Sequence, residues 1–244
     1  MPDEPTADEF VARFLTLVPE EHRELAESNA LVRRGEDDDI RAGARMGKIF
    51  ALAKEFALLP PAEIERLLES PLHDIRVGAV SVMGHQYPRK RTTEERRTEL
   101  YDLYLRRTDR INTWDLVDVS GHKVVGNHLL ARPRDVLYEL AKSDHFYERR
   151  LAMFATVMFV GRGDLDDTYR LAEILVDDPE HFVNTVVGTL LRETGKHDRP
   201  RLVAFLDRHA ATMPRITLRF AIEHMDAAQR KDLMGRAKQA KTAG

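Results

Sequence analysis

Trp114 and Asp118 are the residues of this sequence best suited, by type and spacing, to do chemistry. Residues four apart leave the same face of a helix, one turn from each other. An aromatic face attracts positive charge, and a carboxylate stabilises positive charge as it develops during a reaction. The pair therefore predicts chemistry on a cationic or cation-like substrate. The same spacing also fits a plainer interpretation, in which a core Trp lies beside a capping or solvated Asp.

The composition limits the other classes of function. The chain has 244 residues, 43 % of them hydrophobic, which is enough for a large core. It contains no cysteine, which excludes a thiol nucleophile, a disulfide and a thiolate metal site. We expect neither a signal peptide nor a membrane span, because no apolar run approaches the roughly 18 residues that a bilayer requires. A net charge of -3 does not favour nucleic-acid binding, although it permits a local basic face.

Amphipathic helices are predicted along nearly the whole chain, for example from Ile40 to Phe56, where apolar residues recur near the helical period. Short polar junctions begin 38, 35, 35 and 35 residues apart, at Ser70, Thr108, Ser143, Asp178 and Met213. Four of these residues are good helix N-caps. Periods of this length, with two helices each, are typical of an α-solenoid. We therefore predict an all-α fold of HEAT-like repeats with one concave wall; the alternative is an irregular helical bundle.

The repeats predict a single domain over residues 7–237, between a disordered tail at residues 1–6 and a C-terminal tail at residues 238–244. Three segments, residues 67–79, 140–152 and 175–187, share the order of cap, spacer, polar residue and small apolar residue. In a solenoid the second helices of successive repeats line one wall. The register therefore predicts a wall that carries Arg76, Trp114, Arg149, Asn184 and Arg219, with Asp118 below Trp114 and Arg150 beside Arg149.

An arginine-rich wall predicts a groove for duplex DNA, because Arg donates paired hydrogen bonds to phosphate. Other basic residues, Lys123 among them, are more typical of solvated helix faces. Asp115 points about 100° away from Trp114 on a helix and is predicted to be structural. The histidines, including His122, show no metal-binding spacing.

The chain resembles the AlkD family of DNA alkylation repair glycosylases, which are HEAT-like repeat proteins, over about residues 8 to 236. The resemblance is carried by residues 45–47, 56–60, 63–81, 148–152, 188–193 and 214–225 and by the motif Trp-Asp-Leu-Val-Asp at 114–118. This motif, followed by Arg-x-Ala, is specific when it occurs inside such repeats and weak alone.

The resemblance implies roles for single residues. Trp114 matches the Trp that stacks against the deoxyribose of the damaged nucleotide, and Asp118 matches the Asp that helps to cleave the N-glycosidic bond. Arg150, with Arg149 as the second choice, matches the Arg that holds the DNA backbone. The family removes cationic N3- and N7-alkylated purines without flipping the base into a pocket, unlike most glycosylases. The residues expected to bind DNA are Arg45, Lys48, Arg76, Arg149, Arg150, Asn184, Thr189, Arg192 and Arg219.

The sequence also departs from the family before the Leu-Arg-Glu segment. Thr189 stands where members have a second lesion-contacting Trp, and Thr185 replaces a basic residue. Loss of a stacking aromatic removes roughly 1–3 kcal/mol of binding and opens space. Activity on small methylated bases is then weakened or lost, or the wider groove admits a bulkier adduct; the residues leave both outcomes open.

Two functions follow as expectations. The first is a monofunctional DNA glycosylase of base excision repair, a hydrolase without metal or cofactor that acts on alkylated bases in double-stranded DNA. The second is a non-catalytic HEAT-like scaffold that binds DNA or protein. We expect a monomer in the cytoplasm, with no membrane partner, that associates with the bacterial nucleoid when bound to DNA.

Overall fold

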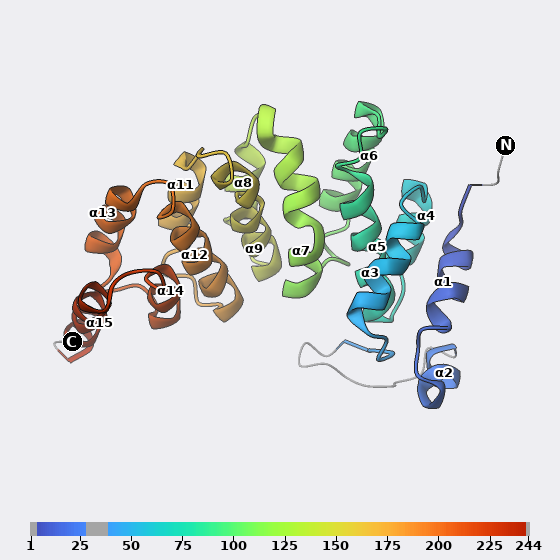
Figure 1. Ribbon diagram of the computed structural model, residues 1–244, viewed down its shortest axis with the longest axis horizontal. Coiled ribbons are helices and arrows are strands. Elements are labelled where there is room, and N and C mark those ends of the chain that lie inside the picture. Colours follow the sequence, from blue (N-terminus) through green and yellow to red (C-terminus); the bar gives the residue numbers. More distant parts are fainter. Residues whose placement is uncertain (1–3, 28–38, 243–244) are drawn as a thin grey trace. The chain divides into compact units, whose positions relative to one another are not determined.

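Helices make up the regular structure of the chain over residues 4–27 and 39–242, which the computed structural model describes (Figure 1). They form two compact units, Met1–His128 and Leu129–Gly244. Within each unit, consecutive helices pack against one another in a repeating pattern. The predicted all-α fold of helical repeats is confirmed. The division into two units was not part of the prediction.

The first unit is built around α5 (His73–Gln86), which packs against α3 (Met46–Glu55), α4 (Pro61–Leu68) and α7 (Trp114–Gly121). Its other helices are α1 (Ala7–Leu15), α2 (Glu20–Glu27), α6 (Glu94–Arg106) and the π-helical turn η1 (His122–Gly126), which continues α7. Every residue of α5 except His85 is buried. Because α5 is surrounded on nearly all sides, it fixes the positions of α3 and α7.

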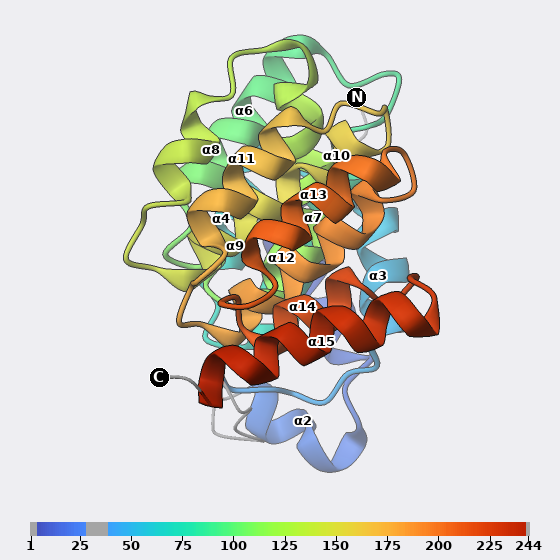
Figure 2. The ribbon, with the colours of Figure 1, turned by 90° about the vertical axis from the view of Figure 1, so that its left-hand side faces the viewer.

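The second unit is built around α12 (His181–Thr194), which packs against α9 (Phe146–Ala155), α11 (Asp166–Leu175) and α14 (Arg215–Ala221). Its other helices are η2 (Leu129–Ala131), α8 (Asp135–Leu140), α10 (Val157–Val160), α13 (Arg199–His209) and α15 (Ala227–Thr242). Figure 2 shows α15 lying against α14.

The ends of the chain differ in part from the expectation. Helix α15 continues to Thr242, so the C-terminal tail predicted from residue 238 begins inside a helix. At the other end, Thr6 caps α1 with its hydroxyl. Residues 1–3 of the predicted N-terminal tail and residues 243–244 lie outside the described part. No helix within the described ranges is long and apolar enough to cross a membrane.

The predicted junctions lie between the paired helices, and three of them form the same turn. In each, the side-chain oxygen of the first residue accepts a hydrogen bond from the backbone N–H two residues later, which is typical of Ser and Asp in turns. The pairs are Ser70 and Leu72 at 3.2 Å, Ser143 and His145 at 3.1 Å, and Asp178 and Glu180 at 2.9 Å. The prediction that these residues are helix N-caps is wrong, because each lies two residues before the cap position of its helix.

Residues 39–45 are not helical, so the helix predicted from Ile40 begins at Met46. Gly43 has a φ of 84°, a left-handed conformation that glycine adopts without steric penalty. The carbonyl of Ile40 accepts a hydrogen bond from the N–H of His73 over 2.8 Å. The segment that leads into α3 is therefore fastened to the beginning of α5.

Candidate active site

A cavity of about 490 Å³ lies in the first unit, among α3, α5, α7 and η1. This size falls within the range of roughly 300–1,000 Å³ that is usual for small-molecule sites. The residues that line it are Met46, Phe50, Ser81, His85, Trp114, Asp115, Asp118, Val119, His122 and Lys123. The cavity therefore combines apolar walls with carboxylate, imidazole and amino groups.

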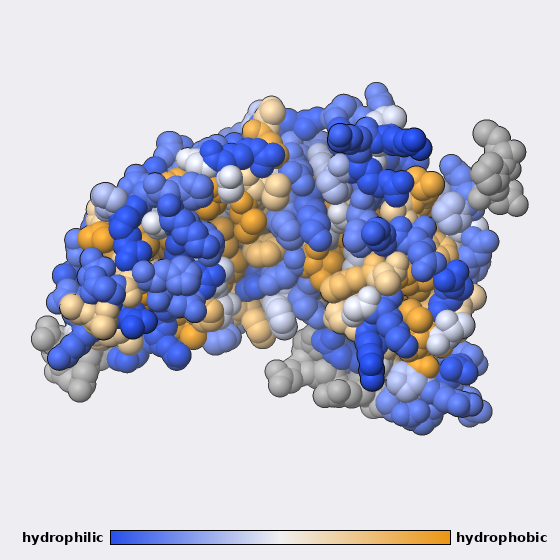
Figure 3. All heavy atoms as spheres, viewed as in Figure 1, coloured by the Kyte–Doolittle hydropathy of each residue, from blue (hydrophilic) through white to orange (hydrophobic). Residues whose placement is uncertain are grey.

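Exposed apolar side chains gather at this cavity. Five large hydrophobic residues of the described chain are exposed, and three of them, Met46, Phe50 and Trp114, line the cavity. The space-filling view shows apolar surface between α3 and α7 (Figure 3). Contiguous apolar surface left in water is typical of an interaction site, whereas single exposed residues are not. The cavity is thus the strongest candidate for a binding site in the first unit.

Trp114 and Asp118 contribute to the cavity from one helix. Trp114 is the first residue of α7, and Asp118 follows one turn later. Both line the cavity, and their spacing on one α-helix puts them on the same face, as the sequence predicts. The interpretation of Trp114 as a core residue is wrong, because the residue is 41 % exposed. A cationic group in the cavity can therefore contact the indole face and the half-buried carboxylate of Asp118.

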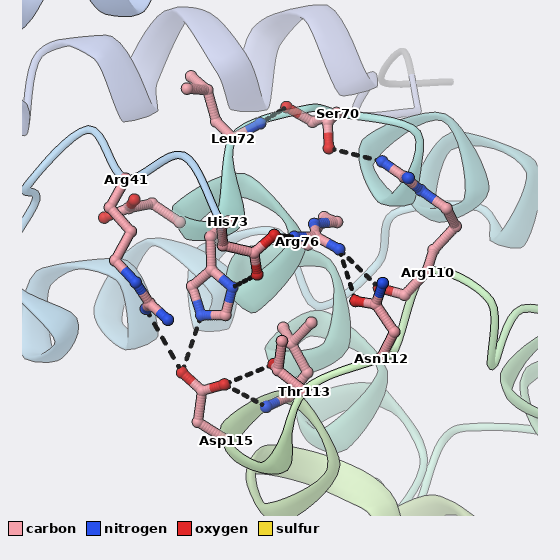
Figure 4. Close-up of polar contacts among 12 residues, drawn as sticks. Arg41, Ser70, Leu72, His73, Arg76, Arg110, Asn112, Thr113 and Asp115 are labelled. Carbon is pink, nitrogen blue, oxygen red and sulfur yellow. Dashed lines mark hydrogen bonds and ion pairs between the residues drawn. The ribbon is translucent and has the colours of Figure 1, made fainter. Parts of the chain in front are cut away.

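Asp115, the other carboxylate of α7, is held by protein groups (Figure 4). Its Oδ2 lies 2.8 Å from Nε2 of His73 and 3.6 Å from Nη1 of Arg41. Its Oδ1 accepts a hydrogen bond from the hydroxyl of Thr113 over 2.6 Å. These contacts agree with the structural role predicted for Asp115.

His73 joins Asp115 to Asp39, and these three residues are called the His73 cluster here. Nδ1 of His73 lies 2.6 Å from Oδ2 of Asp39, and the ring is buried. An imidazolium, which donates from both nitrogens, satisfies both carboxylates. Burial opposes the charge on His73, but the hydrogen bonds to Asp115 and Asp39 outweigh it and raise the pKa. Burial likewise disfavours ionised Asp115, but the hydrogen bond and charge of His73 hold its pKa well below the usual range.

The His73 cluster positions two walls of the cavity. Asp115 directly follows Trp114 at the start of α7, and Asp39 begins the segment that leads to Met46 and α3. His73 lies at the start of the central helix α5. The imidazole on α5 thus binds two elements that are far apart in the sequence, the segment before α3 and the start of α7.

Among the lining residues that were not predicted as site residues, three carry basic side chains: His85, His122 and Lys123. Burial and the positive charge of Lys123 lower the pKa of both imidazoles, that of His122 to about 4. Both histidines are therefore neutral at neutral pH. The helix widens to a π-helix at His122, a feature frequent at functional sites. The sequence carries no distinct signal for that turn, so His122 and Lys123 resembled ordinary surface residues.

The structure corrects the predicted position of Arg76. Arg76 is buried, and its guanidinium forms an ion pair with Asp39. It also donates hydrogen bonds to Oδ1 of Asn112 over 2.8 Å and to the carbonyl of Arg110 over 3.2 Å (Figure 4). Arg76 thus connects α5 to the loop before α7 instead of lying on an exposed wall.

The equivalent residues of the second unit also connect neighbouring repeats. Arg149 forms an ion pair with the buried Asp178 in the next junction, at 2.6 Å, and donates to the carbonyl of Ser143 over 2.9 Å. Asn184 is buried and accepts a hydrogen bond from Thr217 of α14 over 3.3 Å. The expectation that these polar side chains form an exposed wall is therefore corrected.

Arg150, the residue expected to hold the DNA backbone, is buried as well. Its Nη1 donates to the carbonyl of Phe182 and, over 3.3 Å, to the hydroxyl of Thr185. Both acceptors belong to α12, the second helix of the next repeat. Arg150 therefore links α9 to α12 through its hydrogen bonds.

The remaining residues of the predicted DNA-binding set are more accessible. Arg45 and Lys48 are exposed at the start of α3, and Arg219 is exposed on α14. Within the described residues these three side chains make no hydrogen bond or ion pair. Thr189 is half-buried on α12, and Arg192, on the same helix, forms ion pairs with Glu193 and Glu223.

No group of three or more His, Asp or Glu residues in the described ranges is arranged to hold a metal ion. None of the curated proteins compared with the chain matches it. The sequence model of a family described as DNA alkylation repair enzyme matches residues 18–225, which include both α7 and α12. Since the match covers most of the sequence, this chain belongs to the DNA alkylation repair enzyme family, as its resemblance to AlkD predicted.

Proposed function

We propose that the protein is a DNA glycosylase that hydrolyses the N-glycosidic bond of cationic N3- or N7-alkylated purines in duplex DNA. The observation that carries the proposal is the cavity in which the exposed Trp114 and the carboxylate of Asp118 face one space. Membership of a DNA alkylation repair family supplies the class of substrate. As the resemblance to AlkD implies, the damaged base is not drawn into a pocket of its own.

The chemistry of the lesion suits these two groups. Alkylation at N3 or N7 places a positive charge on the purine and makes it a good leaving group. As the bond to the sugar breaks, an oxocarbenium-like cation develops at C1′ of the deoxyribose. The carboxylate of Asp118 stabilises that cation and orients or deprotonates the attacking water. The indole of Trp114 offers its face to the same sugar.

The surrounding groups favour this division of roles. Asp115 is held by His73 and Thr113, whereas Asp118 lines the cavity together with Trp114, one turn further along α7. His85 and His122 are neutral at neutral pH and therefore add no positive charge to that of Lys123 in the cavity. The size of the cavity, about 490 Å³, is compatible with a sugar together with an adduct larger than a methyl group.

The test compares wild-type protein with Asp118→Asn and with Asp102→Asn, which changes an exposed carboxylate on α6 of the same unit. Release of alkylpurine is measured by chromatography, both from methylated duplex DNA and from duplex carrying a bulky cationic adduct. Duplex binding is measured by fluorescence anisotropy. We expect Asp118→Asn to bind DNA without releasing base and Asp102→Asn to behave as wild type.

The alternative is a non-catalytic scaffold, which the replacement of a stacking Trp by Thr189 favours. Wild-type protein that binds duplex DNA but releases no base from either substrate would establish that alternative and refute the glycosylase. Release from the bulky adduct alone would support the proposal and restrict the substrate to large lesions.

A further inference from the structure

A lysine, Lys123, lies in the cavity where the proposed reaction would produce a cationic sugar. It lines the cavity that contains Trp114 and Asp118, and its charge lowers the pKa of both His85 and His122. His85 and His122 line the same cavity as Lys123. Within the described residues, the side chain of Lys123 has neither a hydrogen bond nor an ion pair.

The packing of α5 against α7 leaves room for this lysine. Gly84 of α5 has no side chain, and a Cβ built there would lie 2.9 Å from Cβ of Ser120 and 3.3 Å from Cδ of Lys123. The aliphatic part of Lys123 thus passes close over a glycine. A larger residue at that position would displace Lys123 or push α7 away from α5.

A fixed positive charge beside a sugar that is becoming a cation disfavours hydrolysis. Arg45 and Lys48 are already exposed in the same unit for contact with phosphate. Lys123, in contrast, lies inside the cavity with the proposed catalytic carboxylate. An amino group in such a place is suited to covalent chemistry with a carbonyl, because an uncharged lysine forms Schiff bases.

We propose that Lys123 is a nucleophile toward the aldehyde of an abasic site and gives the protein a second activity, cleavage of the DNA strand by β-elimination. This rests on the proposed function, because base release leaves an abasic deoxyribose in this cavity. The protein is then a bifunctional glycosylase and lyase, contrary to the monofunctional enzyme that the sequence predicted.

The step balances without a further reactant. The abasic sugar opens to an aldehyde at C1′, and Nζ of Lys123, after losing a proton to water or a neutral imidazole, forms a bond to that carbon. Water leaves the resulting carbinolamine, and an iminium forms. A base then removes a proton from C2′, the C–H electrons form the C2′=C3′ double bond, and the C3′–O bond breaks with the 3′ phosphate as the leaving group. Water finally hydrolyses the iminium and restores the amine.

His122 is the group of the cavity that we assign to the proton at C2′. Its imidazole lines the cavity, and because burial and the charge of Lys123 lower its pKa to about 4, it is unprotonated at neutral pH and acts as a weak base. It precedes Lys123 in the chain and lines the same space. With this assignment the two steps can be distinguished by mutation. Formation of the iminium needs Lys123 alone, and elimination needs both Lys123 and His122.

The experiment uses duplex DNA with a preformed abasic site, so that no glycosylase activity is required. Sodium borohydride reduces an iminium to a stable amine and thereby cross-links the protein to the DNA. The variants are Lys123→Arg, which keeps the charge but does not form the iminium, and Lys90→Arg, which changes an exposed lysine of the same unit outside the cavity. Circular dichroism verifies that each variant is folded.

We expect wild type and Lys90→Arg to be cross-linked and to cut the strand, and Lys123→Arg to lose both properties while it still binds the duplex. His122→Gln should keep the cross-link and cut more slowly. Absence of a cross-link with wild type that binds the abasic duplex overturns the proposal, as does a cross-link with Lys123→Arg equal to that of wild type.

Release of alkylpurine, measured in parallel, separates this proposal from the proposed function. Base release without a cross-link refutes the lyase and leaves the glycosylase standing. A cross-link that depends on Lys123, without base release, supports the lyase and refutes the glycosylase.

Discussion

The imidazole of His73 donates to the carboxylate of Asp115 over 2.8 Å, although 42 residues separate them in the sequence. This bond links the first turn of α5 to the first turn of α7, directly beside Trp114. It also removes one of the two carboxylates of α7 from the chemistry of the cavity. The same imidazole binds Asp39, so the segment before α3 depends on it as well.

The His73 cluster predicts a loss of stability as the pH rises. The pKa of His73 lies above its ordinary value of 6.5 in the folded protein, so the folded state holds this proton more tightly than the unfolded chain. Its contribution is complete below the unfolded pKa and disappears as the pH rises through the folded pKa. Urea unfolding of the first unit, followed by the fluorescence of the single Trp114, should give a lower free energy at about pH 9 than at about pH 6.

His73→Gln is the control for the change in stability between about pH 6 and about pH 9, since it removes the titrating group. It should lose most of the pH dependence and, at about pH 6, roughly 3 kcal/mol of stability, because two carboxylates remain without their imidazolium. Equal pH dependence in wild type and variant would show that another group titrates.

At acid pH the dependence of stability on pH has the opposite sign. The pKa values of Asp39 and Asp115 are lowered in the folded protein, so their contribution to stability disappears only as the pH falls below the ordinary carboxyl range.

Trp114→Ala should weaken binding without weakening the fold. Trp114 is 41 % exposed. Loss of a stacking aromatic costs about 1–3 kcal/mol of binding, which raises Kd roughly 5- to 150-fold. Titration of the variant with duplex that contains an abasic site measures this loss, and thermal unfolding followed by circular dichroism measures stability. Trp114→Phe should bind with intermediate affinity. A large fall in Tm with unchanged Kd would assign Trp114 to packing.

Arg149→Ala should reduce stability by roughly 3 kcal/mol, because it leaves the buried carboxylate of Asp178 unpaired. Arg219→Ala, in the same unit, should change stability by less than about 0.5 kcal/mol, since its side chain is exposed. The salt dependence of duplex binding should respond in the opposite way. Arg219→Ala should reduce the slope by about one unit, and Arg149→Ala should leave it unchanged.

The measurement is Kd at several salt concentrations, combined with urea unfolding followed by circular dichroism. If Arg149→Ala flattens the salt dependence while stability is retained, Arg149 contacts phosphate as the sequence predicted, and its ion pair with Asp178 opens on binding. An unchanged slope for Arg219→Ala would remove Arg219 from the phosphate-binding residues.

The features that the sequence predicted correctly depend on short-range chemistry. The junctions at Ser70, Ser143 and Asp178 were predicted at the right places, because Ser and Asp are typical of the breaks between helices, although they close turns there and are not N-caps. The shared face of Trp114 and Asp118 requires only that the segment be helical. Both properties are local, so a single sequence contains them.

The features that were missed depend on contacts between distant segments. Arg76 is 37 residues from its ion-pair partner Asp39. A sequence pattern does not distinguish an arginine that links two segments in this way from an arginine that faces solvent. His73 resembled any other histidine until its two carboxylate partners, 34 and 42 residues away, were placed beside it. Repeat register therefore predicted the position of Arg76 along its helix but not the direction of its side chain.

Gly188→Ala should destabilise the second unit, because α12 and α14 approach each other closely at this residue. A Cβ at position 188 would lie 2.5 Å from the carbonyl oxygen of Thr217 and 2.7 Å from Cβ of Phe220. A backbone oxygen cannot turn aside as a side chain can, so we expect a loss of about 1–3 kcal/mol in urea unfolding followed by circular dichroism. Gly235→Ala in α15 is the matched control, since nothing lies within 4 Å of a Cβ there. It should be neutral or stabilise by up to about 1 kcal/mol through helix propensity. Equal effects at both positions would show that the helices separate at little cost, and Gly188 would then not be required for packing.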